Sequence, residues 1–173
     1  MTLEEFDALA AADAEAALLA CCASRRWAAE VAGGRPFGDP GRLRSAASAA
    51  LDGLEWADVE EALAAHPRIG ERAAGAGREA SWSRREQSGM DAAGREVREA
   101  LAEGNRRYEE RFDHVFLICA TGLGAAEMLA ALEERLGNDA AAERVIVRRE
   151  LGRIMRLRLD ELLDGAAARG TGG

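Results

Sequence analysis

The sequence predicts an all-α protein built as a single compact, multi-helix domain. Hydrophobic residues make up 48% of the chain but aromatic residues only 5%, and the apolar positions are mostly alanine and leucine, which favour helices. A chain of 173 residues can also bury a sizeable core without disulfides or metals. We therefore expect one helical domain over residues 1–164 and a disordered tail over residues 165–173, which lack large apolar side chains.

The composition argues against several classes of function. A net charge of −8 opposes the phosphates of nucleic acid, and no apolar run approaches the roughly 20 residues that span a membrane. Every basic residue is an arginine, which excludes lysine Schiff bases and pyridoxal phosphate. The cysteines and histidines lack metal-site spacing, and the adjacent Cys21 and Cys22 suit no disulfide framework. We expect a cytoplasmic protein without nucleic-acid or membrane partners.

Local signals predict two helices separated by a loop in the first third of the chain. Thr2 and Glu5 form a capping box at the start of the first helix, whose apolar positions continue to Leu19. The glycine- and proline-rich stretch SRRWAAEVAGGRPFGDPGR then predicts a loop. Asp39 before Pro40 resembles an N-cap with proline in the first turn, so the second helix begins there.

His66 stands where the third predicted helix must end. This helix begins with a cap at Asp58, and Pro67 stops it because a residue before proline is pushed out of helical geometry. The glycine-rich stretch after Pro67 predicts a loop. Ser83 and Glu86 form a further capping box that begins the next helix.

The second half of the chain contains three more helical patterns. Residues 91–112 form the clearest amphipathic helix, whose polar face we expect to be solvated. The apolar run HVFLICATG fits either a strand or a buried segment, and periodicity does not decide between them. A helix with Met128 and Leu132 on its apolar face ends before Gly137, and residues 139–163 form a long last helix.

One motif raises the possibility of a nucleotide site. GLGAAE, from Gly122 to Glu127, resembles a dinucleotide-binding fingerprint, but Glu127 stands where glycine or alanine is expected. Only HVFLICA and RVIV could supply strands, too few for a nucleotide-binding sheet. We therefore expect no nucleotide, although a glycine-flanked helix start still suits an anionic ligand.

Taken singly, the other candidate residues have plain structural explanations. A histidine at a helix end, such as His66, is more often structural than catalytic. Glu86 could serve only as the capping partner of Ser83, and Arg158 could be one of several solvent-facing arginines on its helix. His114 borders an apolar run, and we expect it to be structural.

In combination, these residues fall within four motifs that lie in register. The motifs are AAHPRIGE, SRREQSGM, FDHVFLICATGLGAAEMLAALEERLGND and ELGRIMRLRL, with WAAEVAGGRPF upstream. Together they resemble the 2-oxo-4-hydroxy-4-carboxy-5-ureidoimidazoline (OHCU) decarboxylase family of urate degradation, over roughly residues 3–163. The chain departs from the family in reading HPRIGE where many members read HPDLAG, and TGLGAAE where many read TGKSAEE.

The resemblance implies an enzyme that needs neither metal nor cofactor, converts the small molecule OHCU to (S)-allantoin and is commonly a homodimer. It assigns the catalytic roles to His66, Glu86 and Arg158. The implied substrate-binding residues are Pro67, Ser83, Gln87, Ile118, Cys119, Ala120, Thr121 and Gly122, the last five through their backbone.

The residue types fit this chemistry. Histidine, with an unperturbed pKa of about 6.5, exchanges protons near neutral pH. Glu86 and Gln87 match the hydrogen-bonding groups of a ureido heterocycle, and Arg158 offers a planar fork for a carboxylate or carbonyl. A competing hypothesis is a catalytically inactive, helical interaction module on the same scaffold, which would show no turnover and no ligand pocket at His66.

Overall fold

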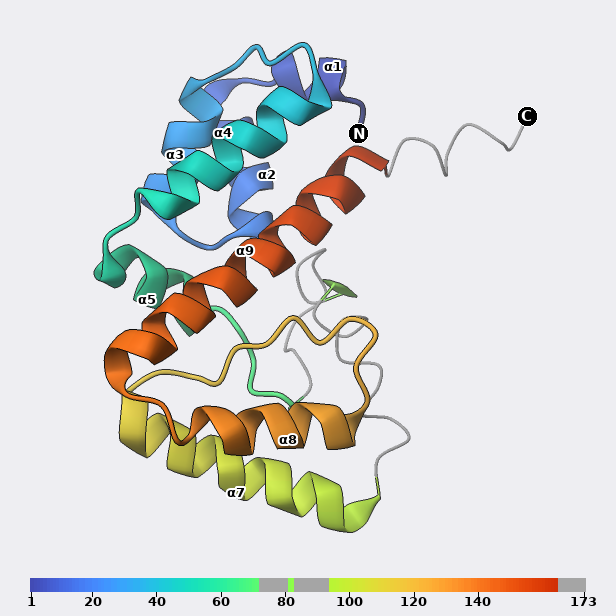
Figure 1. Ribbon diagram of the computed structural model, residues 1–173. Helices are drawn as coiled ribbons and strands as arrows, with labels where there is room; N and C mark the ends of the chain where they lie inside the picture. The colour runs from blue at the N-terminus through green and yellow to red at the C-terminus, as the bar shows by residue number, and fades with distance from the viewer. Residues whose placement is uncertain (72–80, 83–93, 165–173) are drawn as a thin grey trace, which may run out of the picture. The chain divides into compact units, whose positions relative to one another are not determined.

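The computed structural model describes residues 1–71, 81–82 and 94–164 (Figure 1). Within these ranges all regular secondary structure is helical and there is no strand, as the sequence predicts. The chain divides into two compact units, which we call unit 1 (Met1–Ala62 with Gly152–Gly173) and unit 2 (Leu63–Leu151). The predicted tail over residues 165–173 lies outside the described residues, and the domain extent of 1–164 stays a prediction.

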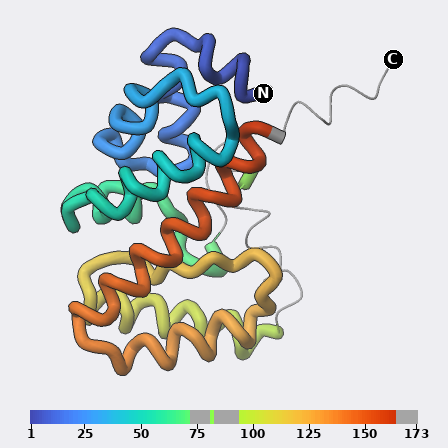
Figure 2. The backbone as a smooth tube through the Cα atoms, turned by 45° about the horizontal axis from the view of Figure 1, so that its top comes forward, coloured from blue at the N-terminus to red at the C-terminus, as the bar shows by residue number. Residues whose placement is uncertain are grey.

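In unit 1, one helix packs against two others. Its helices are α1 (Leu3–Asp7), α2 (Ala11–Cys21), α3 (Arg25–Gly33), α4 (Pro40–Asp52), most of α5 (Trp56–Ala64) and the last part of α9 (Ala140–Asp164). Helix α3 packs against both α2 and α4, as the two backbone views show (Figures 1 and 2). Trp27 of α3 is fully buried, and its indole N–H donates to the Ala47 carbonyl at 2.9 Å. The polar edge of this large side chain is thereby satisfied inside the core.

The first predicted helix is in fact two helices, α1 and α2. The break between them is held by contacts distant in sequence. The Arg35 guanidinium donates to the carbonyls of Phe6 at 2.9 Å and Leu9 at 2.8 Å, and the Asp7 carboxylate accepts the Phe37 amide at 3.0 Å. The bonds from Arg35 satisfy carbonyls at and after the end of α1, and local periodicity does not reveal them.

The loop predicted from Ser24 onward is also wrong over its first half, where the chain forms α3. The Ser24 hydroxyl accepts the Trp27 amide at 3.3 Å and caps this helix. Trp27 and Val31, four residues apart, lie on its buried face. The predicted start of the next helix is confirmed, because Asp39 caps α4 and Pro40 is its first residue.

Two further helix starts test the predicted caps. The Thr2 hydroxyl accepts the Glu5 amide at 3.0 Å and the Glu5 carboxylate accepts the Thr2 amide at 2.8 Å, which confirms the first capping box. Asp58, in contrast, lies inside the first turn of α5 and accepts the Glu55 amide at 3.0 Å. Helix α5 therefore begins at Trp56, earlier than predicted.

Unit 2 is organised around the pair formed by α7 (Arg95–Phe112) and α8 (Ala125–Arg135), which lie side by side (Figures 1 and 2). Gly104 permits their close approach, since a Cβ atom there would lie 2.6 Å from a methyl group of Leu132. The core cluster of the unit consists of Ile69, Leu101, Tyr108, Phe116, Ile118, Ala120, Ala125, Met128 and Leu132. The apolar run HVFLICATG, for which the sequence allowed either a strand or a buried segment, is neither helix nor strand over residues 115–120. The second possible strand, RVIV, lies within α9.

Candidate active site

His66 lies at a helix exit, as its position before proline predicts. Helix α5 ends at Ala64, and the His66 amide donates to the Leu63 carbonyl at 2.9 Å in the turn after the helix. His66 and Pro67 are both partly exposed. The imidazole is therefore carried by a stretch of chain that leaves the helix, instead of by the buried face of α5.

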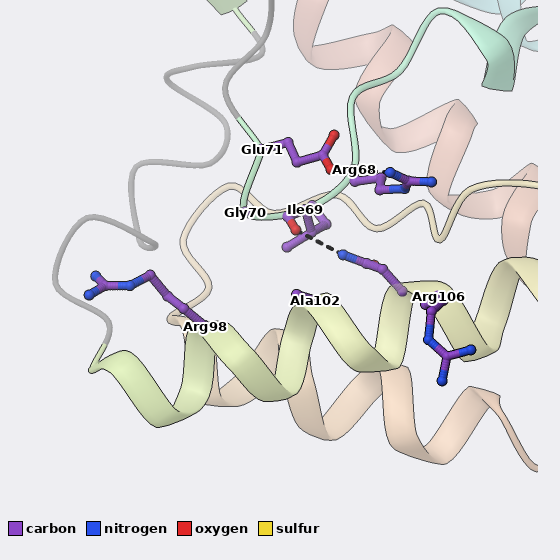
Figure 3. A pocket seen from close by; sticks show the side chains of 8 residues that line it. Arg68, Ile69, Gly70, Glu71, Arg98, Ala102 and Arg106 are labelled. Carbon is purple, nitrogen blue, oxygen red and sulfur yellow. Dashed lines mark hydrogen bonds and ion pairs between the residues drawn. The ribbon is translucent and has the colours of Figure 1, made fainter.

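The segment after Pro67 is fastened to α7. Ile69 is only 6% exposed and belongs to the unit 2 core. Its carbonyl accepts the Asn105 side-chain amide at 2.9 Å, the dashed bond in Figure 3. The Arg68 guanidinium pairs with Glu109 of α7 at 2.6 Å. Asn105 and Glu109 thus dock this segment on α7, whereas most of the other charged residues of the helix are exposed, as the sequence predicts.

The departure from the usual HPDLAG motif has a structural counterpart. Arg68 and Glu71, two residues of HPRIGE, pair with each other at 3.2 Å in addition to the bond from Arg68 to Glu109. The hydrogen bond from Arg68 also holds the pKa of the Glu109 carboxyl below its usual range. Arg68 therefore attaches the segment to α7 by charge, and Glu71 pairs with the same guanidinium.

A pocket of about 410 Å³ opens beside this segment (Figure 3). It is lined by Arg68, Ile69, Gly70, Glu71, Arg98, Ala102, Asn105 and Arg106. Its guanidinium groups include Arg68 and Arg106, which already pair with glutamates. Among the described residues, its lining contains none of the predicted site residues.

Arg158 is buried, with 2% of its surface exposed, within unit 1. Its Nη1 atom lies 3.4 Å from the Ala20 carbonyl, and it is close enough to Cys22 to influence that thiol, whose pKa burial raises to about 12 despite the positive charge. Arg153 and Arg156 of the same helix are exposed. A solvent-facing Arg158, the plain structural explanation, is therefore excluded.

The predicted backbone site at residues 118–122 has a buried stem and an exposed tip. Ile118, Cys119 and Ala120 are each less than one-tenth exposed, whereas Thr121 and Gly122 are exposed. The tip is a turn in which the Leu123 amide donates to the Ala120 carbonyl at 3.0 Å. Gly122 has a φ of 82°, a left-handed conformation that glycine adopts without strain.

A buried ionic network that the sequence did not reveal supports this stem. Arg135 of α8 pairs with Glu143 of α9 at 2.6 Å and donates to the Leu117 carbonyl at 2.8 Å. The Tyr108 hydroxyl also donates to Glu143. Burial alone would raise the pKa of Glu143, but the hydrogen bonds from Arg135, Tyr108 and Asn138 outweigh it and lower that pKa.

The other predicted residues, Ser83, Glu86 and Gln87, lie outside the described residues. His66 belongs to unit 2 and Arg158 to unit 1, so the convergence of His66, Glu86 and Arg158 stays a prediction. Within the described ranges there is no group of three or more His, Cys, Asp or Glu side chains that could hold a metal. Nor does any described helix have the length and apolar character needed to cross a membrane.

Comparisons with known proteins point to one family. A family model described as OHCU decarboxylase matches residues 7–160. The chain is 33% identical over 138 residues to the 2-oxo-4-hydroxy-4-carboxy-5-ureidoimidazoline decarboxylase of Amia calva, covering 79% of each protein. It is 30% identical over 151 residues to the uric acid degradation bifunctional protein TTL of Arabidopsis thaliana, covering 85% of this chain and spanning about half, 46%, of that longer protein.

A solved structure gives the same answer for the fold. The chain matches a crystal structure of OHCU decarboxylase in the presence of (S)-allantoin with a TM-score of 0.75 and 30% identity. The match covers 84% of this chain and 96% of that one, which confirms the predicted all-helical fold class. The chain therefore belongs to the OHCU decarboxylase family.

Proposed function

We propose that this chain is a carboxy-lyase that converts OHCU to (S)-allantoin in urate degradation, without a cofactor. The match to OHCU decarboxylase along residues 7–160 carries this proposal. The matched crystal structure, determined in the presence of (S)-allantoin, supports the same ligand chemistry. The chain itself contributes His66 at a helix exit and a buried Arg158.

The substrate can supply its own electron sink. When the carboxylate leaves as carbon dioxide, the electron pair of the broken bond passes into the conjugated ring, so no metal or organic cofactor is required. His66 accepts or donates the proton at the reacting hydroxyl or carbon. Protonation from one fixed side then yields one enantiomer of allantoin, whereas unaided decay is expected to give the racemate.

The remaining residues bind and orient the substrate in this proposal. Glu86 accepts hydrogen bonds from ureido N–H groups, and Gln87 both donates and accepts. Arg158 binds a carboxylate or ring carbonyl through its planar fork. Pro67, Ser83 and the backbone of residues 118–122 complete the pocket.

Activity is expected to survive removal of metals. The purified chain, after exhaustive chelation and dialysis, should consume freshly generated OHCU faster than the enzyme-free solution, as followed by absorbance. Activity lost on chelation and restored by one metal would contradict the cofactor-independent mechanism. A rate equal to the spontaneous decay before chelation would contradict the enzyme proposal and favour the inactive interaction module.

Arg158→Lys is expected to lower kcat/KM by about 10- to 100-fold, the equivalent of one charge-assisted hydrogen bond of about 1.5–3 kcal/mol. Lysine keeps the positive charge but loses the two-pronged geometry. Steady-state kinetics measures the effect, and thermal unfolding checks the fold. Arg153→Lys, an exposed position on the same helix, is the matched control and should leave kcat/KM unchanged. Equal kinetics for the two variants would remove Arg158 from the site.

We further propose that the protein acts as a homodimer in the cytoplasm. The family resemblance supports the dimer. Cys21, Cys22 and Cys119 are all buried thiols outside any disulfide in the described structure, which suits a reducing compartment.

A further inference from the structure

Glu150 of α9 holds the backbone of the predicted substrate-binding segment, although the family motifs assign it no role. Its carboxylate accepts the Cys119 amide at 3.0 Å. Two residues earlier, the Leu117 carbonyl accepts a hydrogen bond from Arg135 at 2.8 Å. Helix α9 thus holds the stem through the Cys119 amide, and α8 holds the residue directly before the stem through the Leu117 carbonyl.

The bond to Glu150 satisfies a buried backbone amide that has no partner in regular secondary structure. Residues 115–120 are neither helix nor strand, so regular secondary structure does not pair their buried amides. Cys119 is 4% exposed, and a buried amide without an acceptor is costly. Glu150 is itself 4% exposed. Burying a carboxylate costs free energy unless it is hydrogen-bonded, and here one of its oxygens accepts the hydrogen bond of the Cys119 amide.

The bond to Glu150 lies directly before the turn that carries the exposed tip. The turn closed by the Leu123 amide and the Ala120 carbonyl begins one residue after Cys119. The exposed tip, Thr121 and Gly122, is therefore connected to a stem that Glu150 anchors at the Cys119 amide. A shift of the Cys119 backbone would be passed to the tip, because only Ala120 separates it from Thr121.

We propose that Glu150 is a positioning residue for decarboxylation, which fixes the Cys119 amide so that the backbone of residues 118–122 meets the substrate in one geometry. This inference rests on the proposed function. Glu150 acts through the backbone and does not touch the substrate. Small misplacements of substrate-binding groups have large kinetic effects, of the order of 10²-fold for about 1 Å.

The test compares three variants of the full chain. Glu150→Ala removes the acceptor, and Glu150→Gln keeps an oxygen that can accept the Cys119 amide. Tyr108→Phe deletes the hydroxyl that donates to Glu143, but it keeps the ring and leaves in place the bonds from Arg135 to the Leu117 carbonyl and from the Cys119 amide to Glu150. Two quantities are measured for each: kcat/KM with OHCU, and hydrogen–deuterium exchange of the Cys119 amide by NMR without ligand. If Glu150→Ala does not fold, Glu150→Asp replaces it, because the shorter side chain withdraws the carboxylate from the amide.

Glu150→Ala is expected to lower kcat/KM by about tenfold or more and to accelerate exchange at Cys119 by a similar factor. Glu150→Gln should recover most of both. Tyr108→Phe should lower the unfolding midpoint while kcat/KM stays near the parental value. If Tyr108→Phe lowers kcat/KM as much as Glu150→Ala does, Glu150 contributes only to the stability of the fold, and the proposal is overturned. Parental kcat/KM in Glu150→Ala with accelerated exchange would also overturn it.

The two readouts separate this inference from the proposed function. If the parental chain does not turn over OHCU, the proposed function fails by that measurement alone. The same variants are then titrated with (S)-allantoin. Binding that is weakened in Glu150→Ala and recovered in Glu150→Gln supports the positioning role, and binding that is equal in all variants overturns it.

Discussion

His66→Asn is expected to give a folded protein that decarboxylates OHCU at least about 10²-fold more slowly, as removal of a general acid–base group predicts. Asparagine keeps polar hydrogen-bonding groups but does not exchange protons near neutral pH. The fold should persist because His66 is a partly exposed residue after the end of α5, and the anchoring contacts of the next segment are made by Arg68 and Ile69. Initial rates and a far-ultraviolet spectrum measure the two effects.

The allantoin formed in the presence of His66→Asn should also drift toward the racemate, because spontaneous decay then competes with the slowed enzyme. His114→Asn is the matched control. The ring centroids of His114 and Tyr108 lie 5.5 Å apart in an edge-to-face arrangement. We assign His114 no catalytic role, so His114→Asn is expected to keep the parental rate. A folded His66→Asn variant that still makes one enantiomer at the parental rate would show that His66 is structural.

Arg135→Ala is expected to lower the free energy of unfolding by about 3–5 kcal/mol, the range for breaking a buried ion pair. Glu143 has a fully buried side chain and would lose its cationic partner, and the Leu117 carbonyl would lose its donor. Urea unfolding followed by circular dichroism measures the change. A loss of this size would place the network among the main determinants of stability in unit 2.

Arg106→Ala is the matched control for this prediction. Arg106 also pairs with two glutamates, Glu103 and Glu110, but on the exposed face of α7. Solvent screens such pairs, so the unfolding midpoint should hardly move. Equal destabilisation by the two alanine variants would contradict the conclusion that burial gives the Arg135 pair its importance.

Local signals predicted the helix ends that depend on neighbouring residues. The capping box of Thr2 and Glu5 and the Asp39–Pro40 start are confirmed because a cap needs only side chains within three or four residues. The exit at His66 is set by Pro67 for the same reason. The break between α1 and α2 could not be predicted in this way, since Arg35 fixes it from a distant segment.

The buried charges of Glu143 and Glu150 were missed for a related reason, although α9 contains a signal. Glu143, Glu150 and Arg158 lie at intervals of seven and eight residues, on the same face as the buried Val147 and Leu151. That face of the helical pattern predicts three buried charged residues. Their partners, in contrast, depend on tertiary packing that no spacing reveals.

The measurement that tests the central claim most directly is the optical activity of allantoin formed by the parental chain. Freshly generated OHCU is incubated with and without the protein, and circular dichroism at an allantoin wavelength is followed until the substrate is consumed. The account predicts the persistent signal of (S)-allantoin with the protein and none without it. Racemic product at the spontaneous rate, from protein shown to be folded, would contradict the assignment of this chain as an OHCU decarboxylase.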